Sequence, residues 1–234
     1  MCPTDPPPPP TAPEVIARRR TTRRFDPDRP VAEDLLARIL GLATFAPSDD
    51  NLQPWRFLVV RRASNRRRLR ACAWNDPRVT EAPVVVVVLG YQTPDRSHLG
   101  LVVATMRALG AVTPEAASEL SARASRAMAR MPDRAAWATR AAAFAAAGLM
   151  TAAESLGVGS ALLKGCDPVK VRDAFGVPDD HSVCCLIALG YAAEVPPFPG
   201  RLGLAEVCYE EHFGQPWKPK GVDGRSIVGG QGPL

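Results

Sequence analysis

Apolar residues recur along this chain with two different spacings, and each spacing predicts a type of element. Between residues 31 and 45 they share one helical face, at Leu35, Leu36, Ile39, Leu40 and Ala43, which predicts an amphipathic helix. The run VVVVVLG after Pro83 is apolar at every position and β-branched, which predicts a strand buried on both faces. The alanine-rich stretch 135–156 has few polar residues on any side, so we expect a central helix that ends at Gly157.

Shorter signals predict the remaining elements. Pro13 can open a helix over EVIARRR, and two helices are expected between 98 and 131, with Thr113 capping the second. Further strands are predicted at 56–60, 160–163 and 183–190, and further helices at 65–73 and Pro168–Phe175. Residues from 194 onward are rich in Pro and Gly and predict an extended tail.

Few strands, many helices and no strict alternation between them predict an α+β fold. No G-x-G-x-x-G follows a predicted strand and no P-loop signature occurs, which argues against the two common nucleotide-binding motifs. No apolar run approaches the ~20 residues of a membrane span. The opening MCPTDPPPPPTAP lacks the layout of a secretory signal, so we expect residues 1–12 to form a disordered, proline-rich arm.

The chain carries a formal net charge of +5, and its arginines gather at 18–24 (RRRTTRR) and 61–70 (RRASNRRRLR). For the second cluster a solvated face is favoured over nucleic-acid binding, because no aromatic residue interleaves it for base stacking. In the first cluster Arg19 and Arg23 are four residues apart, so they can project together from a helix end with hydroxyls between them. Planar guanidinium forks and short hydroxyl donors suit a phosphate group.

Cysteines and histidines narrow the chemistry further. The six cysteines form no C-x-x-C pair, which predicts a reducing, cytoplasmic compartment and no structural disulfide. The three histidines lack metal-ligand spacing, so no metal site is expected. No Ser-His-Asp or Cys-His arrangement stands out either.

Seven segments, taken in order, resemble the FMN-dependent nitroreductase family. They are RRTTRRF, VAEDLLARILGLATFA, APSDDNLQPWRFLVV, WNDPRVTEAPVVVVV, AAGLMTAAESLG, ALLKGCDPVKVRDAFGVPDD and VCCLIALGYAAEVPP, followed by Arg201. The resemblance implies an FMN-binding domain over 13–207, a helical insertion or lid at 91–134 and an extended tail over 208–234. It also implies a central mixed or antiparallel sheet surrounded by helices, in a homodimer with a swapped C-terminal extension.

The resemblance further assigns an FMN site residue by residue. The ribityl phosphate would be held by Arg19, Arg20, Thr21, Arg23 and Arg201. The ring edge would be met from the partner chain by Pro47, Ser48, Asp49 and Asn51. Asn75 and Arg78 would reach the pyrimidine end, and the backbone of Leu163, Lys164 and Gly165 would face the central ring. No residue is assigned a catalytic role, because the flavin carries the chemistry.

The activity implied is that of an NAD(P)H-dependent flavin oxidoreductase that reduces nitroaromatics, quinones or related small-molecule acceptors by a ping-pong mechanism. One alternative is a specialised member of the same fold, such as a dehalogenase, an azoline oxidase or a flavin-consuming enzyme. Another is a module that binds nucleic acid or another anionic partner through the arginine clusters. We expect the first, with no nucleic-acid or membrane partner.

Some assignments stay open at this point. Asp49 either stands near the flavin ring, where its charge would oppose reduction, or caps the following turn through its own backbone. Asp50 faces either solvent or a nearby arginine. Without the resemblance, Asn75 reads equally as a turn residue and Arg201 as a solvated charge.

Overall fold

The computed structural model describes residues 9–163 and 165–218. Their contacts group into two compact units, one formed by Thr21–Val195 and the other by the terminal segments 1–20 and 196–234. The predicted domain over 13–207 spans both units, and its boundaries stay a prediction.

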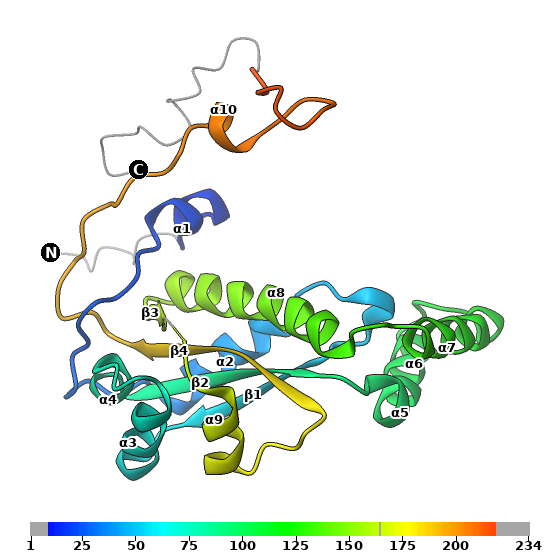
Figure 1. Cartoon of the computed structure of the whole chain (residues 1–234), viewed down its shortest axis with the longest axis horizontal. Helices are drawn as coiled ribbons and strands as arrows, with labels where there is room; N and C mark the ends of the chain where they lie inside the picture. Colours follow the sequence, from blue (N-terminus) through cyan, green and yellow to red (C-terminus); the bar gives the residue numbers. More distant parts are fainter. Residues whose placement is uncertain (1–8, 164, 219–234) are drawn as a thin grey trace, which may run out of the picture. The chain divides into compact units, whose positions relative to one another are not determined.

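A four-stranded antiparallel sheet forms the centre of the Thr21–Val195 unit (Figure 1). Its strands are β1 (Trp55–Val60), β2 (Val84–Tyr91), β3 (Gly159–Leu162) and β4 (His181–Gly190), in the spatial order β1-β2-β4-β3. Every neighbouring pair is antiparallel. The α+β prediction is confirmed, and the sheet is the antiparallel one of the two types expected.

The valine run of β2 is buried on both faces because helices cover both sides of the sheet (Figure 1). Val84, Val86 and Val88 pack with α2 (Glu33–Ala43) and α8 (Arg134–Ser155). Val85 and Val87 pack on the other side with α3 (Ala63–Cys72), α4 (Arg78–Glu81) and α9 (Pro168–Phe175). Since side chains alternate along a strand, this one run supplies the centre of two hydrophobic layers.

Helix α8 lies close against the sheet because its residues are small. A Cβ at Gly90 of β2 would lie 2.6 Å from the carbonyl carbon of Ala138, so the helix backbone touches the strand. The helix begins at Asp133, whose carboxylate accepts from the Ala136 N–H at 2.9 Å. It ends before Gly157, which has φ 74°, as the sequence predicts.

The insertion between β2 and α8 contains three helices, α5 (Pro94–Ser97), α6 (Leu99–Ala108) and α7 (Pro114–Ala129). Two were predicted, and the short α5 was not. The Thr113 hydroxyl accepts from the Ala116 N–H at 3.2 Å, which confirms the predicted cap. Leu120, Ala124 and Met128 of α7 pack against Trp137 in a separate core cluster, so the insertion is attached to the start of α8.

In the terminal unit one prediction agrees with the structure and one differs. Helix α1 (Ala12–Arg18) confirms the helix predicted to open at Pro13, and the Thr11 N–H donates to the Glu14 carboxylate at 2.6 Å before it. The tail expected to be extended contains α10 (Leu204–Val207) and then a turn closed by a bridge between Tyr209 and Pro216. Because the residues after α10 pair with each other, the backbone turns back on itself there and does not stay extended. Residues 1–8 of the predicted arm and 219–234 of the predicted tail lie outside the described residues.

Candidate functional site

The basic segment leaves the helical conformation at the end of α1. Arg19 has φ −53° and ψ 127°, which is extended backbone, so Arg19 and Arg23 do not share a helical turn. The prediction that they project together from a helix end is therefore wrong. At Thr21 the segment forms a parallel bridge with Ser160 of β3, and the Thr22 N–H donates to the Ser160 carbonyl at 2.9 Å.

Two of the predicted phosphate ligands meet within the terminal unit. The guanidinium carbon of Arg20 lies 4.5 Å from the centroid of the Phe198 ring, and that of Arg201 lies 5.6 Å from the same centroid. Among the described residues, neither forms an ion pair with a carboxylate. Two guanidinium groups gathered at one ring without a neutralising acid form a donor set that fits a phosphate.

The loop 46–53 has an unusual backbone. Inside it, the short 3-10 helix Asp49–Asn51 is followed by a tight turn, and φ is positive at Asp50 (48°), Asn51 (55°) and Gln53 (46°). A non-glycine residue in this region costs roughly 1–2 kcal/mol, so contacts elsewhere must hold the loop. One of these is local, since the Ser48 hydroxyl accepts from the Gln53 N–H at 3.0 Å.

The two aspartates of the loop bind helices of the same chain. The indole N–H of Trp137 on α8 donates to the Asp49 carboxylate at 2.8 Å. Arg123 on α7 forms an ion pair with Asp50 at 2.6 Å. Neither alternative for Asp49 included Trp137, whereas an arginine partner for Asp50 was one of the two expected outcomes. The carboxylates therefore fix the loop to the insertion and to the central helix.

His98 supports the end of the same loop. Its Nε2 lies 2.5 Å from the Leu52 carbonyl oxygen, which can only accept, so Nε2 carries the proton. Nδ1 is then an acceptor, and Nη2 of Arg56 donates to it at 3.1 Å. The imidazole stacks on Tyr91 with ring centroids 5.7 Å apart, and the Tyr91 hydroxyl donates to Ser97 at 2.7 Å. Sequence reasoning missed this network because its members are scattered along the chain.

The residues predicted for the pyrimidine end lie where α3 leads into α4. Asn75 has φ 59°, and its carbonyl accepts from Nε of Arg70 at 3.1 Å. Arg78 donates to the Asp76 carboxylate from Nε at 3.0 Å and from Nη2 at 2.5 Å. These hydrogen bonds raise the pKa of Arg78, and the carboxylate offsets its charge. Arg78 therefore brings less net positive charge to a flavin edge than the sequence alone suggests.

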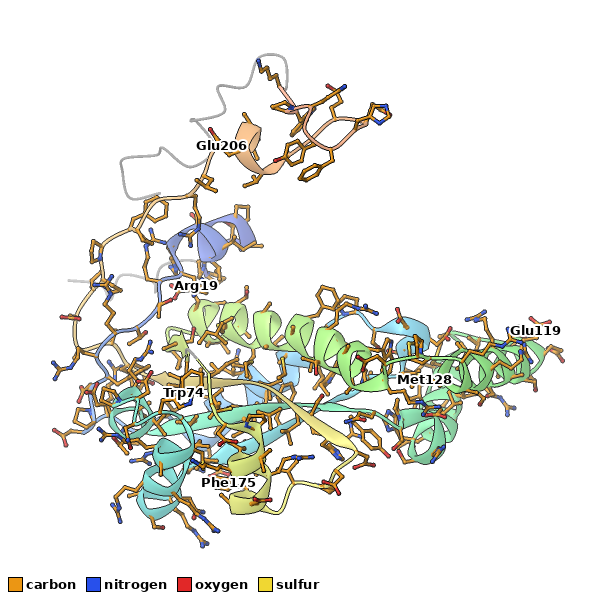
Figure 2. The ribbon with its side chains drawn as sticks, in the orientation of Figure 1. Arg19, Trp74, Glu119, Met128, Phe175 and Glu206 are labelled. Atoms are coloured by element: carbon orange, nitrogen blue, oxygen red, sulfur yellow. The ribbon has the colours of Figure 1, made fainter. Side chains whose placement is uncertain are left out.

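The segment predicted to face the central ring is partly a core element. Leu163 is buried, and its N–H donates to the Leu186 carbonyl at 3.0 Å. Lys164 lies outside the described residues. Gly165 has φ 146°, and a Cβ there would lie 2.8 Å from the indole of Trp74. Trp74, labelled in Figure 2, is 68% exposed, so an exposed aromatic ring lies against Gly165.

The loop 46–53 and the turn at Asn75 lie at opposite ends of the sheet. The loop leads into Trp55, which pairs with Gly90 at the end of β2, whereas the turn precedes Val84 at its beginning. The length of β1 separates them, about 20 Å for six residues. One chain therefore does not bring both predicted ring contacts to the same place.

Three of the residues predicted to meet the ring from the partner chain line one open pocket of about 340 Å³. Its lining residues are Pro47, Ser48, Asp49, Trp137, Arg140, Ala141 and Phe144. Asn51, the fourth predicted residue, is not among them. Sequence reasoning missed the contribution of α8. The spacing 137, 140, 141 and 144 would have indicated one helical face, but the alanine-rich stretch was interpreted only as core.

Some chemistry is not found in the part of the chain that the structure describes. There, no group of three or more His, Cys, Asp or Glu side chains could hold a metal ion. No described helix is long and apolar enough to cross a bilayer. The described cysteines are free thiols, namely Cys72, Cys166, Cys184, Cys185 and Cys208.

Comparison with known proteins places the chain among related sequences and structures. A relative named "NADH dehydrogenase" from Thermus thermophilus is 38% identical over 185 residues, which are 79% of this chain and 88% of that protein. "Putative NAD(P)H nitroreductase YodC" of Bacillus subtilis is 27% identical, over 80% of this chain and 92% of its own length. A crystal structure of "a putative nitroreductase in complex with FMN" from Exiguobacterium sibiricum has a TM-score of 0.79 at 23% identity, covering 85% of this chain and 96% of that one.

The family model "Nitroreductase family" matches residues 16–191. That match covers most of the chain and includes the loop 46–53, the α3–α4 turn and the segment 163–165. The fold of the solved neighbour agrees with the antiparallel sheet and surrounding helices described above. The chain therefore belongs to the nitroreductase family of oxidoreductases.

Proposed function

We propose that the protein is an NAD(P)H-dependent oxidoreductase that holds FMN between two copies of the chain and reduces nitroaromatics, quinones or related acceptors in a ping-pong cycle. The observation that carries the proposal is the family match over residues 16–191, which contains every predicted cofactor residue except Arg201. The names of the relatives support the reductant, since one is an NADH dehydrogenase and another an NAD(P)H nitroreductase.

The residues present fit FMN by two observations. Arg20 and Arg201 gather at one ring in the terminal unit with no carboxylate partner among the described residues, which suits a terminal phosphate rather than the internal diphosphate of FAD. Gly165 lies directly against the Trp74 indole, with no room for a Cβ, and that indole is 68% exposed, so it offers an aromatic face to a planar ring system. When bound, FMN takes electrons from NAD(P)H and passes them to the acceptor, and the protein supplies binding and orientation.

Each part of the chain has a separate task in this proposal. Arg20 and Arg201 of the terminal unit bind the phosphate. The Asn75 turn and the backbone at Gly165 orient the ring, while the loop 46–53 of the second copy covers its edge. No protein side chain needs to act as a nucleophile or as a base in the electron transfer.

Two features of the Thr21–Val195 unit, which contains the loop 46–53, support dimer formation. The loop and the Asn75 turn lie at opposite ends of the sheet, so a second copy is needed to bring both to one flavin. Two large apolar side chains at the C-terminal end of α2 are also exposed, Leu42 by 47% and Phe45 by 86%. Exposed apolar groups that lie together favour a protein–protein contact.

The test is spectroscopic. The purified protein should be yellow, and heat should release FMN. Under anaerobic conditions NADH or NADPH should bleach the flavin absorption, and a nitroaromatic or a quinone should restore it in a second, separate step. Release of FAD, or a colourless protein that does not take up FMN, would contradict the cofactor. Bleaching without reoxidation by either acceptor would contradict the acceptor class and favour a specialised chemistry on the same fold.

A further inference from the structure

The pocket between loop 46–53 and α8 combines one free cation with one exposed aromatic ring. Arg140 and Phe144 are four residues apart on α8, so their side chains share a face of the helix. Both line the pocket of about 340 Å³, together with Ser48 of the loop. A volume of this size accommodates one substituted aromatic ring.

Arg140 differs from the arginines around it. In the parts of the chain that the structure describes, its guanidinium makes no hydrogen bond, ion pair or ring contact. Arg123 is paired with Asp50 at 2.6 Å, and Arg134 with Asp95 at 3.0 Å. The charge of Arg140 is therefore available to a ligand.

The carboxylate in the pocket does not neutralise Arg140. Asp49 accepts the Trp137 N–H at 2.8 Å, and no ion pair joins it to Arg140. The indole hydrogen bond directs the Asp49 carboxylate toward the buried start of α8, where Trp137 is 3% exposed. The lining thus offers an unpaired guanidinium, a hydroxyl and an apolar ring, with its single acid already bound.

We propose that this pocket binds the aromatic electron acceptor, and that Arg140 selects acceptors that carry an anionic substituent such as a carboxylate. The inference rests on the proposed function, and it names the acceptor class for that activity. A guanidinium binds a carboxylate with two parallel hydrogen bonds, and the ring of Phe144, 52% exposed, can stack against the ring of the acceptor. Ser48 adds a hydroxyl that can donate to a nitro or quinone oxygen.

The experiment compares two acceptors that share a ring and differ in charge, 4-nitrobenzoate and the neutral 4-nitrobenzamide. In the reduction, NAD(P)H loses two electrons. The nitro group gains these electrons together with two protons and is converted into a nitroso group and water. We expect the flavin-loaded protein to prefer the benzoate. Arg140→Gln should lower the ratio of the two kcat/KM values, benzoate over benzamide, by roughly 10- to 150-fold, the range expected for a hydrogen bond to a charged group. Arg126→Gln, an exposed arginine of α7 outside the pocket lining, is the matched control.

An unchanged ratio in Arg140→Gln would overturn the inference. Equal losses for both acceptors, accompanied by weaker FMN binding, would also overturn it, because Arg140 would then serve the cofactor. If the wild-type protein reduces neither acceptor although NAD(P)H bleaches its flavin, the proposed function fails instead.

A binding measurement distinguishes failure of the inference about Arg140 from failure of the proposed function. 4-Nitrobenzoate should quench the tryptophan emission of the protein, and Arg140→Gln should raise its Kd by a similar factor whether or not turnover occurs. Equal Kd values in the two proteins would overturn the inference independently of any activity.

Discussion

At the scale of single residues, the loop aspartates act first as structural groups. Three loop residues adopt positive φ, and Asp49 and Asp50 compensate by binding Trp137 and Arg123. Both carboxylates are acceptors only, so each needs a donor from outside the loop. The question of whether Asp49 also affects the flavin then becomes one of charge alone, because its position is set by the indole.

Two substitutions separate the charge of Asp49 from its hydrogen bond. Asp49→Asn keeps an oxygen that can accept from Trp137 and removes the charge. If the ionised group lies near a bound flavin, this variant should raise the midpoint potential, by ~30 mV for each 1.4 kcal/mol of interaction, with little change in the free energy of unfolding. Trp137→Phe removes the donor to this carboxylate and should lower the free energy of unfolding by about 1.5–3 kcal/mol. Redox titration and urea unfolding measure the two effects.

A midpoint potential that stays the same in Asp49→Asn would show that the carboxylate does not interact with the flavin. The charge argument would then be wrong, while the structural role would stand on the unfolding data for Trp137→Phe. No loss of stability in that second variant would contradict the structural role.

At the scale of elements, the helical insertion and the loop 46–53 form one connected assembly. Arg123 of α7 and His98, between α5 and α6, contact Asp50 and Leu52 of the loop, and α8 provides Trp137. A change in the insertion therefore reaches the loop through specific side-chain contacts. This connection gives the insertion a structural role in holding the loop 46–53.

We expect Arg123→Ala to release the loop without unfolding the insertion. The Arg123 side chain is 63% exposed and does not belong to the core cluster that α7 joins. The amides of α7 should therefore stay protected from hydrogen exchange in this variant. Hydrogen–deuterium exchange should become severalfold faster at residues 49–53 and stay unchanged along α7. Arg126→Ala, one turn away on the same helix, is the control. Equal exchange at the loop in both variants would contradict the connection.

At the scale of the whole molecule, the proposed flavin site requires two copies of the chain. The separation of the loop from the Asn75 turn along the sheet and the exposed side chains Leu42 and Phe45 support this proposal. In the free chain these apolar groups face water, at a cost of roughly 25 cal/mol for each Å² that a partner would cover.

Phe45→Glu should therefore convert the protein from a dimer to a monomer and release its flavin together. The reason is that Phe45, 86% exposed, would place a charge in the apolar contact. Light scattering gives the mass, and flavin absorption of the same sample gives the occupancy. Leu109→Glu is the control, since Leu109 is 79% exposed at the end of α6. A wild-type monomer that retains flavin would contradict the two-chain site.

The amino-acid sequence by itself determined the elements and the family of this protein. Hydrophobic periodicity predicted α2, β2 and α8, and Thr113 and Gly157 fixed the ends of two helices, because these signals act between residues a few positions apart. The ordered motifs predicted the family, which the match over 16–191 confirms. The tail and the helical spacing of Arg19 and Arg23 were predicted wrongly, since nothing local in those segments encodes where the backbone turns.

Only the tertiary structure decided which side chains are free to act. Asp49 and Trp137 are 88 positions apart, and Asp50 and Arg123 are 73 apart, so no local pattern could pair them. The unpaired state of Arg140 follows in the same way from how α7 and α8 pack. The physical reason is that a charge or a donor acts over a few ångströms, and packing alone determines which groups from distant parts of the chain come within that range.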